Sequence, residues 1–124
     1  MVAYSFKQRF ADPIEQRTKL QTIRLDRKRH ARKGEELQLY QGMRTRHCRL
    51  LRRATCTLVC DIEINWKPPV IIRLDKFIVL AERGMLEDFA RKDGFEDLAD
   101  MRAFWEAEHP GLTIFRGKLI RWEA

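Results

Sequence analysis

The sequence predicts one α+β domain, a small mixed or antiparallel β-barrel with two or three short helices packed at one end. Its 124 residues, 44% of them hydrophobic, are enough for one core and leave no room for a second. Apolar and polar residues alternate through much of residues 1–80, which favours strands, and apolar residues recur at helical spacing between 85 and 108. Residues 113–122 return to a strand pattern, so we expect a closed or partly closed sheet.

The first half of the chain is predicted to contain strands and one short helix. Asp12 can cap that helix with Pro13 at its first position, where an amide donor is not needed. Lys33-Gly34 marks a turn, and the alternation after it is that of a half-buried strand. The predicted elements are a strand at 4–10, a helix from 13 to 17, a strand beginning at 22 and a strand at 36–40.

The second half is predicted to contain the longest strand, two shorter strands, two helices and a closing strand. Asn65–Pro69 interrupts the β-favouring residues, Asp75 joins the two shorter strands, and Gly94 stops the first helix. Asp97 or Asp100 can cap the second helix. The predicted elements are strands within 49–64 and at 70–74 and 76–80, helices at 85–93 and 98–108, and a strand at 113–122.

The composition favours a cytoplasmic protein without a membrane segment. No stretch approaches the roughly 20 apolar residues that span a bilayer, and the start of the chain, MVAYSFKQRF, lacks the apolar region of a secretory signal. The cysteines are odd in number, and strand alternation places Cys56 and Cys60 on one face as reduced core thiols. His47-Cys48 and the two later cysteines do not supply the paired spacings of a zinc site, so we predict neither a metal nor a cofactor.

Basic charge is concentrated in the first half of the chain. Residues 1–56 hold 15 Lys and Arg against 5 Asp and Glu, whereas residues 57–124 hold 10 against 13. Such a density attracts a polyanion over a Debye length of about 8 Å, and arginine suits phosphate. Nucleic acid is favoured over an anionic membrane because no amphipathic basic helix accompanies the charge. The predicted nucleic-acid contacts are Arg27, Lys28, Arg29, Arg32, Lys33, Arg46 and Arg49.

The segment Lys19-x-x-Thr22-x-Arg24 combines an amine, a hydroxyl and a guanidinium within a few residues. In a strand that starts near Thr22, the period of two sends Thr22 and Arg24 to one face, and a preceding turn can fold Lys19 toward them. A partly neutral amine can accept the hydroxyl proton, and the guanidinium can hold a phosphate or an oxyanion. The alternative is that Lys19 and Arg24 are solvated surface charges and Thr22 is an ordinary strand residue.

Four segments of the chain resemble the ASCH domain, a relative of the PUA domain: KLQTIR after QRF, GEELQLYQGMR, ARKDGF, and HPG before the last strand. The resemblance runs from Phe6 to Trp122 and implies a small PUA-like β-barrel. Within this group the sequence resembles the small bacterial acetylcytidine amidohydrolases, which cleave the acetyl amide of N(4)-acetylcytidine. The resemblance implies that Lys19 is the base, Thr22 the nucleophile and Arg24 a positioning cation.

The third catalytic member departs from the family pattern. Those enzymes have a glutamate ahead of the final helix, where this chain offers Asp93, one methylene shorter, with Glu96 or Asp97 as alternatives. From the residues alone, Asp93 is a helix-end residue before its Gly94 cap. The family glycine two positions before the lysine is Arg17 here, which could tighten or occlude the entrance to the site.

Two further functions use the same residues. In a noncatalytic RNA-binding module, Lys19 and Arg24 would hold phosphates, and Tyr40 or a tryptophan would stack on an unpaired base. In a ribonuclease, Lys19 and an acid would act on a phosphodiester. Tyr40 and Arg44 lie at a strand end and its basic turn and are predicted to contact the substrate, although most such tyrosines pack. The expected partner is a modified nucleoside or RNA, and no pattern indicates an oligomeric state.

Overall fold

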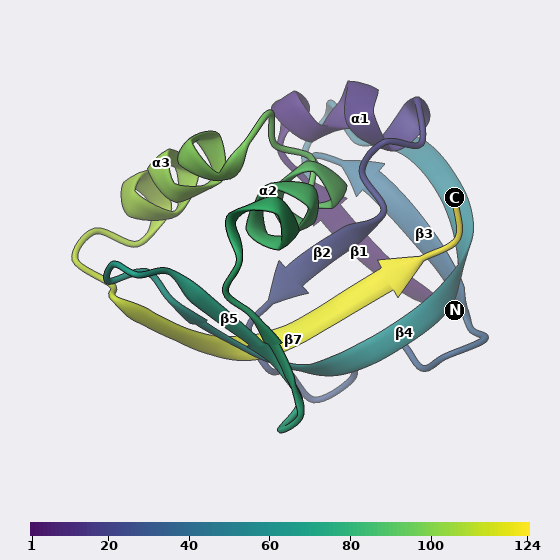
Figure 1. Ribbon diagram of the computed structural model, residues 1–124. Helices are drawn as coiled ribbons and strands as arrows, with labels where there is room; N and C mark the ends of the chain where they lie inside the picture. The colour runs from purple at the N-terminus through teal and green to yellow at the C-terminus, as the bar shows by residue number, and fades with distance from the viewer.

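One long strand, β4 (Arg49–Asn65), organises the fold in the computed structural model of residues 1–124 (Figure 1). Its first half pairs with β3 (Glu36–Gln41). Its second half pairs with β7 (Ile114–Trp122) and, near its end, also with β5 (Ile71–Leu74). A strand of this length rises by roughly 55 Å, so it can carry several neighbours in succession.

The remaining strands extend this sheet. β1 (Val2–Phe6) runs parallel to β3, β2 (Gln21–Arg24) runs antiparallel to β7, and β6 (Ile78–Leu80) runs antiparallel to β5. The result is a mixed sheet of seven strands with the order β1-β3-β4-β5-β6, to which β7 and β2 are joined through β4. The α+β class and the mixed sheet predicted from the sequence are confirmed.

The sheet curves strongly in Figure 1 but does not close into the predicted barrel. Closure would need a backbone ladder between β1 and β2, and these strands pair with β3 and β7 alone. A side chain bridges the gap instead, because Arg24 on β2 donates from Nη2 to the carbonyl oxygen of Ser5 on β1 at 2.6 Å. Because β1 and β2 do not pair with each other, side chains such as Arg24 occupy the space between the two strands.

Three helices cover the sheet: α1 (Ala11–Glu15), α2 (Arg83–Lys92) and α3 (Leu98–Glu108). The last two pack against each other, and Figure 1 shows both over one side of the curved sheet. Each buries an apolar stripe in the single core, including Leu86 and Phe89 on α2 and Met101 and Trp105 on α3. None of the helices is long and apolar enough to cross a membrane.

The start of the chain differs from the predicted pattern. The first strand ends at Phe6, and a short 3-10 helix (Gln8–Phe10) runs directly into α1, so the strand predicted through Phe10 is wrong. The predicted Asp12 cap is also wrong, because α1 begins at Ala11 without a side-chain cap. The Ala11 amide already donates to the Gln8 carbonyl, so the preceding turn takes the place of a capping side chain.

Other boundaries agree more closely. Asp97 caps α3 by accepting from the Asp100 amide at 2.8 Å, which selects one of the two predicted caps. The strand predicted at 76–80 is shortened to β6, because Asp75 has a φ of 52° and begins a turn that runs through Phe77. Cys56 and Cys60 are buried free thiols, as predicted.

Candidate functional site

A turn and a strand position the Lys19-x-x-Thr22-x-Arg24 segment. The amides of Thr18 and Lys19 both donate to the Pro13 carbonyl, at 2.9 and 3.0 Å, and fold the chain back after α1. β2 then begins at Gln21, so alternation sends Thr22 and Arg24 to the same side. The predicted geometry of a turn followed by a strand is confirmed.

Arg17 adopts the conformation for which glycine is usually chosen. Its φ is 64°, in the left-handed region. Its guanidinium donates to the carbonyl oxygen of Ala124 at 3.2 Å, and Arg17 does not line the cavity that holds Lys19. Arg17 therefore adopts the turn conformation before Lys19, and its side chain does not occlude the cavity.

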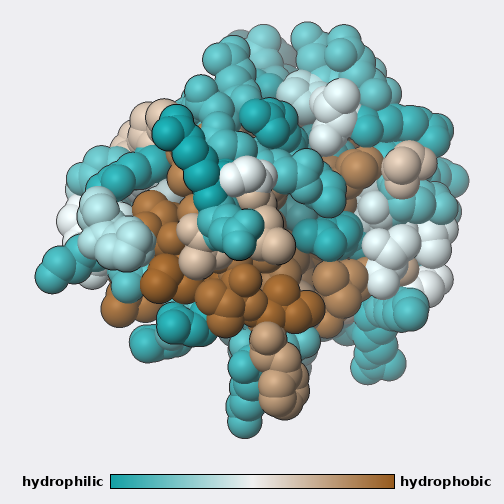
Figure 2. All heavy atoms as spheres, in the orientation of Figure 1, coloured by the Kyte–Doolittle hydropathy of each residue, from teal (hydrophilic) through white to brown (hydrophobic).

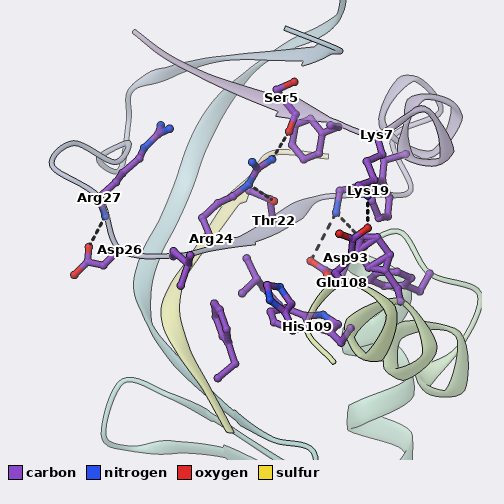
Figure 3. Close-up of a pocket in the computed structure, with 18 residues that line it drawn as sticks. Ser5, Lys7, Lys19, Thr22, Arg24, Asp26, Arg27, Asp93, Glu108 and His109 are labelled. Carbon is purple, nitrogen blue, oxygen red and sulfur yellow. Dashed lines mark hydrogen bonds and ion pairs between the residues drawn. The ribbon is translucent and has the colours of Figure 1, made fainter. Parts of the chain in front are cut away.

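A cavity of about 490 Å³ opens between β1, β2 and the two larger helices (Figure 3). Lys19, Thr22 and Arg24 line it from the first half of the chain, and Asp93 lines it from the end of α2. Aromatic rings form much of the remaining wall. They are Phe6, Phe10, Phe95, Phe104, Trp105 and Phe115, accompanied by His109.

Lys19 and Asp93 form a buried pair within this cavity. Their exposed fractions are 2% and 5%, and Lys19 Nζ lies 3.7 Å from Asp93 Oδ1. Lys19 Nζ also donates to the backbone carbonyl of Asp93, and its nitrogen lies 4.6 Å from the centre of the Phe10 ring. Gly94 permits this approach, because an added Cβ would lie 2.8 Å from Lys19 Cδ.

Burial shifts both pKa values toward neutrality. It lowers the pKa of Lys19 from 10.5 to about 8, a shift that the Asp93 carboxylate opposes and the Arg24 charge reinforces. It raises the pKa of Asp93 from 3.8 to about 6, against the attraction of Lys19. Lys19 is therefore neutral part of the time near physiological pH, which a surface lysine is not.

Thr22 is buried beside this pair and accepts a hydrogen bond from Arg24. Arg24 Nε donates to Thr22 Oγ1 at 3.0 Å, and Figure 3 shows the same guanidinium reaching Ser5. Because the Thr22 oxygen acts as the acceptor, its own proton is free to go to a base. No hydrogen bond joins Thr22 to Lys19, whose ammonium instead faces Asp93, but the two side chains enter one cavity.

Two polar residues that the sequence patterns did not single out connect Asp93 to β7. Gln21 is fully buried and donates from Nε2 to Asp93 Oδ1 at 3.5 Å. Arg121 donates twice to Gln21 Oε1, at 3.2 and 2.9 Å, and so fixes which end of the amide faces Asp93. The only sequence signal was that Gln21 lies between Lys19 and Thr22 in the motif.

Of the three acids considered for the site, Asp93 alone lines the cavity. Asp97 is occupied as the cap of α3, and the Glu96 amide donates to Asp100. Asp93 is at the same time the residue that follows α2, with Gly94 next at a φ of 95°. Asp93 is therefore both the C-terminal cap residue of α2 and a residue that lines the cavity.

Tyr40 and Arg44 do not line the cavity. Tyr40 lies on β3, and its hydroxyl donates to Gln38 Oε1 at 3.3 Å. Arg44 is exposed in the turn after β3 with a φ of 65°. That turn reaches β1 through the Met43 amide, which donates to Ser5 Oγ at 3.0 Å.

The predicted nucleic-acid contacts fall into three groups. Arg29 forms an ion pair with Glu35, and Arg49 forms one with Glu15 at 3.2 Å, so these charges are partly neutralised within the protein. Arg27 borders the cavity, with its guanidinium 4.6 Å from the centre of the Tyr4 ring. The other four have no carboxylate partner and are exposed: Lys28, Arg32, Lys33 and Arg46.

Most rings of the aromatic wall also belong to the hydrophobic core. Trp105 is 9% exposed, packs on Phe115 with ring centres 4.6 Å apart, and also borders the cavity. Trp66 is buried and tilted against Trp105 at 6.1 Å, away from the cavity. Lys7 and Glu108 form an ion pair at the rim, which ties the segment after β1 to the end of α3 (Figure 3).

The buried lysine makes stability depend on pH. Between about 8 and 10.5 the unfolded chain binds a proton at Lys19 that the folded protein has released, so the free energy of unfolding gains a contribution that increases with pH. Lys19→Met removes this contribution. Urea unfolding at several pH values in this window should show a steeper rise for the wild type than for the variant, and equal slopes would contradict a lowered lysine pKa.

Comparisons of the chain with protein-family models, with curated proteins and with solved structures found no match.

Proposed function

We propose that this chain is an ASCH-type domain of the PUA-like group that hydrolyses the acetyl amide of acetylated cytidine. The observation that carries the proposal is the buried Lys19–Asp93 pair, which shares one cavity with the Thr22 hydroxyl. A buried lysine with a pKa near neutrality suits general base catalysis, and a hydroxyl next to such a base suits nucleophilic attack.

In the proposed reaction, Lys19 in its neutral form takes the proton of Thr22 while Oγ1 attacks the acetyl carbonyl carbon. Arg24 already donates to Oγ1 at 3.0 Å, so its positive charge stabilises the developing alkoxide. This step requires the Lys19 amine to turn within the cavity, from the Asp93 carbonyl toward the hydroxyl. The product of this step is a tetrahedral intermediate with a negatively charged oxygen, for which the Arg24 guanidinium supplies a donor, because the amides of Thr18 and Lys19 already donate to Pro13.

Collapse of the intermediate breaks the bond between the acetyl carbon and the cytosine amine. The Lys19 ammonium formed in the first step donates its proton to the leaving amine, which releases cytidine and leaves acetyl-Thr22. Water then attacks this ester with Lys19 as the base again. As the ester bond breaks, the Lys19 ammonium returns the proton to Thr22 Oγ1, and acetic acid leaves and ionises to acetate in solution. Asp93 has a pKa of about 6 and is ionised where Lys19 is neutral, so its role is to orient the amine by accepting a hydrogen bond.

The shape of the cavity supports a flat aromatic substrate. Its volume of about 490 Å³ lies in the range of sites for small molecules. Phe10, Phe95 and Phe104 pack against one another with ring centres 5.4 Å apart, which gives a rigid apolar wall beside the Lys19 amine. A nucleobase can pack on such rings while its exocyclic group reaches the polar residues.

The test is incubation of the protein with N(4)-acetylcytidine and chromatographic detection of cytidine and acetate. An N-acetylated aliphatic amine serves as the control substrate, because it carries the amide without the base. Cytidine should appear with the first substrate, and little product should form with the second. Absence of turnover on acetylated cytidine, as nucleoside and within single-stranded RNA, would contradict the proposal.

The rate of hydrolysis should increase with pH. Neutral Lys19 is the active form, so kcat/KM should rise about tenfold per pH unit below about 8 and level off above it. Asp93→Asn removes the carboxylate that raises the Lys19 pKa, so the midpoint should move to lower pH even though the rate falls. A profile measured for both proteins checks this, and a rate that declines as pH passes 8 would require the ammonium instead.

A second candidate function is RNA binding without catalysis, which is favoured by the basic segment Arg27–Lys33. It follows β2 directly, and its first residue borders the cavity next to Leu25 and Asp26. Lys28, Arg32 and Lys33 are exposed there. Binding of single-stranded RNA that weakens steeply with salt and yields no product would favour this function, whereas shortened RNA would indicate a nuclease.

A further inference from the structure

An exposed apolar strand forms one end of the sheet, and it is distinct from the cavity. β6 is the terminal strand in the order β1-β3-β4-β5-β6, and it pairs with β5 alone. Phe77, Ile78 and Val79 are 89%, 55% and 48% exposed. Figure 2 shows apolar side chains gathered in a band low on the face where Figure 1 places β5 and β7.

The two edge strands of the sheet differ in whether side chains cover their backbone groups. At the other end, the carbonyls of Ser5 and Ala3 on β1 accept hydrogen bonds from Arg24 and Arg27, at 2.6 and 3.5 Å. No comparable side chain reaches the backbone of residues 76–81, and their only backbone partners lie on β5. An apolar strand with an open edge is a template for another strand, and proteins usually protect such edges.

The sequence around β6 is complementary to itself. It reads Lys76-Phe-Ile-Val-Leu-Ala-Glu82, with opposite charges at the ends and apolar residues between them. If two copies pair antiparallel with Val79 opposite Val79, Ile78 faces Leu80 of the other copy. Extended to the residues that flank β6, the same register brings Lys76, in the turn before the strand, near Glu82 of the other copy, which follows the strand, twice by symmetry.

We propose that two copies of this chain associate through their β6 strands to form a symmetric dimer with a continuous sheet. The backbone groups of the outer edge supply hydrogen bonds, the exposed apolar residues lose contact with water, and the two Lys76–Glu82 pairs set the register. The interface is short, so the dissociation constant is on the order of micromolar or weaker. Residues 76–82 do not line the catalytic cavity, so both cavities stay open in the dimer.

Charge reversal tests the register. Lys76→Glu gives a chain with two acidic ends and Glu82→Lys gives one with two basic ends, so each variant alone should lose the dimer. A mixture of the two should form a heterodimer, because every end then meets an opposite charge. Lys76→Glu/Glu82→Lys in one chain should restore the homodimer. Arg91→Glu is the control, since it makes the same change of charge at an exposed residue of α2 without an ion-pair partner.

Sedimentation velocity over protein concentrations from about 10 µM to about 1 mM covers the expected range of affinity. Circular dichroism of each variant checks that the fold is retained. Val79→Pro, at the centre of the proposed contact, should also be monomeric at every concentration, because proline removes the amide donor of that residue. The proposal would be overturned if the wild type stayed monomeric at every concentration. It would also be overturned if both single charge reversals left the dimer unchanged.

Discussion

Lys19→Met is expected to abolish hydrolysis of acetylated cytidine while the protein remains folded. Methionine keeps most of the side-chain volume and its packing on Phe10, but it cannot accept the Thr22 proton. Loss of a general base that also serves as the proton donor should lower kcat by about 10³-fold or more. Steady-state rates at saturating nucleoside give kcat, and far-ultraviolet circular dichroism shows whether the fold persists.

Two further variants distinguish the loss of a catalytic group from the loss of a positive charge. Lys92→Met removes a half-exposed lysine of α2, which pairs with Asp88 at 3.2 Å, and should leave kcat unchanged. Thr22→Val removes the nucleophile and retains the Lys19 charge, so it should reduce kcat as severely as Lys19→Met. If Lys19→Met raised KM and kept kcat, Lys19 would hold the substrate and the proposed chemistry would be wrong.

The local half of the site could be predicted from the sequence because its geometry is local. The period of two in β2 is enough to align Thr22 with Arg24, and the turn before it needs few residues to bring Lys19 alongside. Asp93 lies 74 residues further on, and its place depended on resemblance together with the Gly94 stop signal. Burial of Lys19 could not be predicted, because a basic neighbourhood in the sequence indicates a solvated surface.

The remainder depends on long-range register. Gln21 meets Arg121 because β2 and β7 pair across 100 residues, and no local pattern encodes that pairing. The aromatic wall has no sequence signal of its own, because a ring that borders a cavity and a ring that fills the core follow the same apolar pattern. The predicted barrel was wrong for a related reason. Strand patterns predict which residues form strands, but they do not predict whether the edge strands β1 and β2 pair with each other.

The ion pairs of the first, basic half of the chain also depend on contacts made in the folded structure. Arg29 and Arg49 belong to two basic clusters in the sequence, yet each meets a carboxylate, Glu35 and Glu15. Glu15 and Arg49 are 34 residues apart and are brought together by the packing of α1 on β4. The charge available to a polyanion is therefore smaller than the sequence count suggests, and its densest run is the segment after β2, with Arg27, Lys28, Arg32 and Lys33.

Gly94→Ala is expected to lower the free energy of unfolding by about 3 kcal/mol and to impair catalysis. Alanine resists the φ of 95°, and its Cβ would also lie 2.8 Å from Lys19 Cδ and 3.1 Å from Phe10 Cδ1. Relief of that overlap must shift the Lys19 side chain, and with it the amine, away from its place beside Asp93. Urea unfolding and kcat on acetylated cytidine measure the two effects.

Gly34→Ala is the matched control, because Gly34 has a φ of 90° and nothing lies within 4 Å of an added Cβ. It therefore shares the backbone cost of about 1 kcal/mol but not the overlap, and it should keep full activity. The difference between the two variants isolates the contact of residue 94 with Lys19. Equal destabilisation and equal activity in both would mean that Lys19 adjusts freely, and the rigid placement on which the proposed base depends would then be wrong.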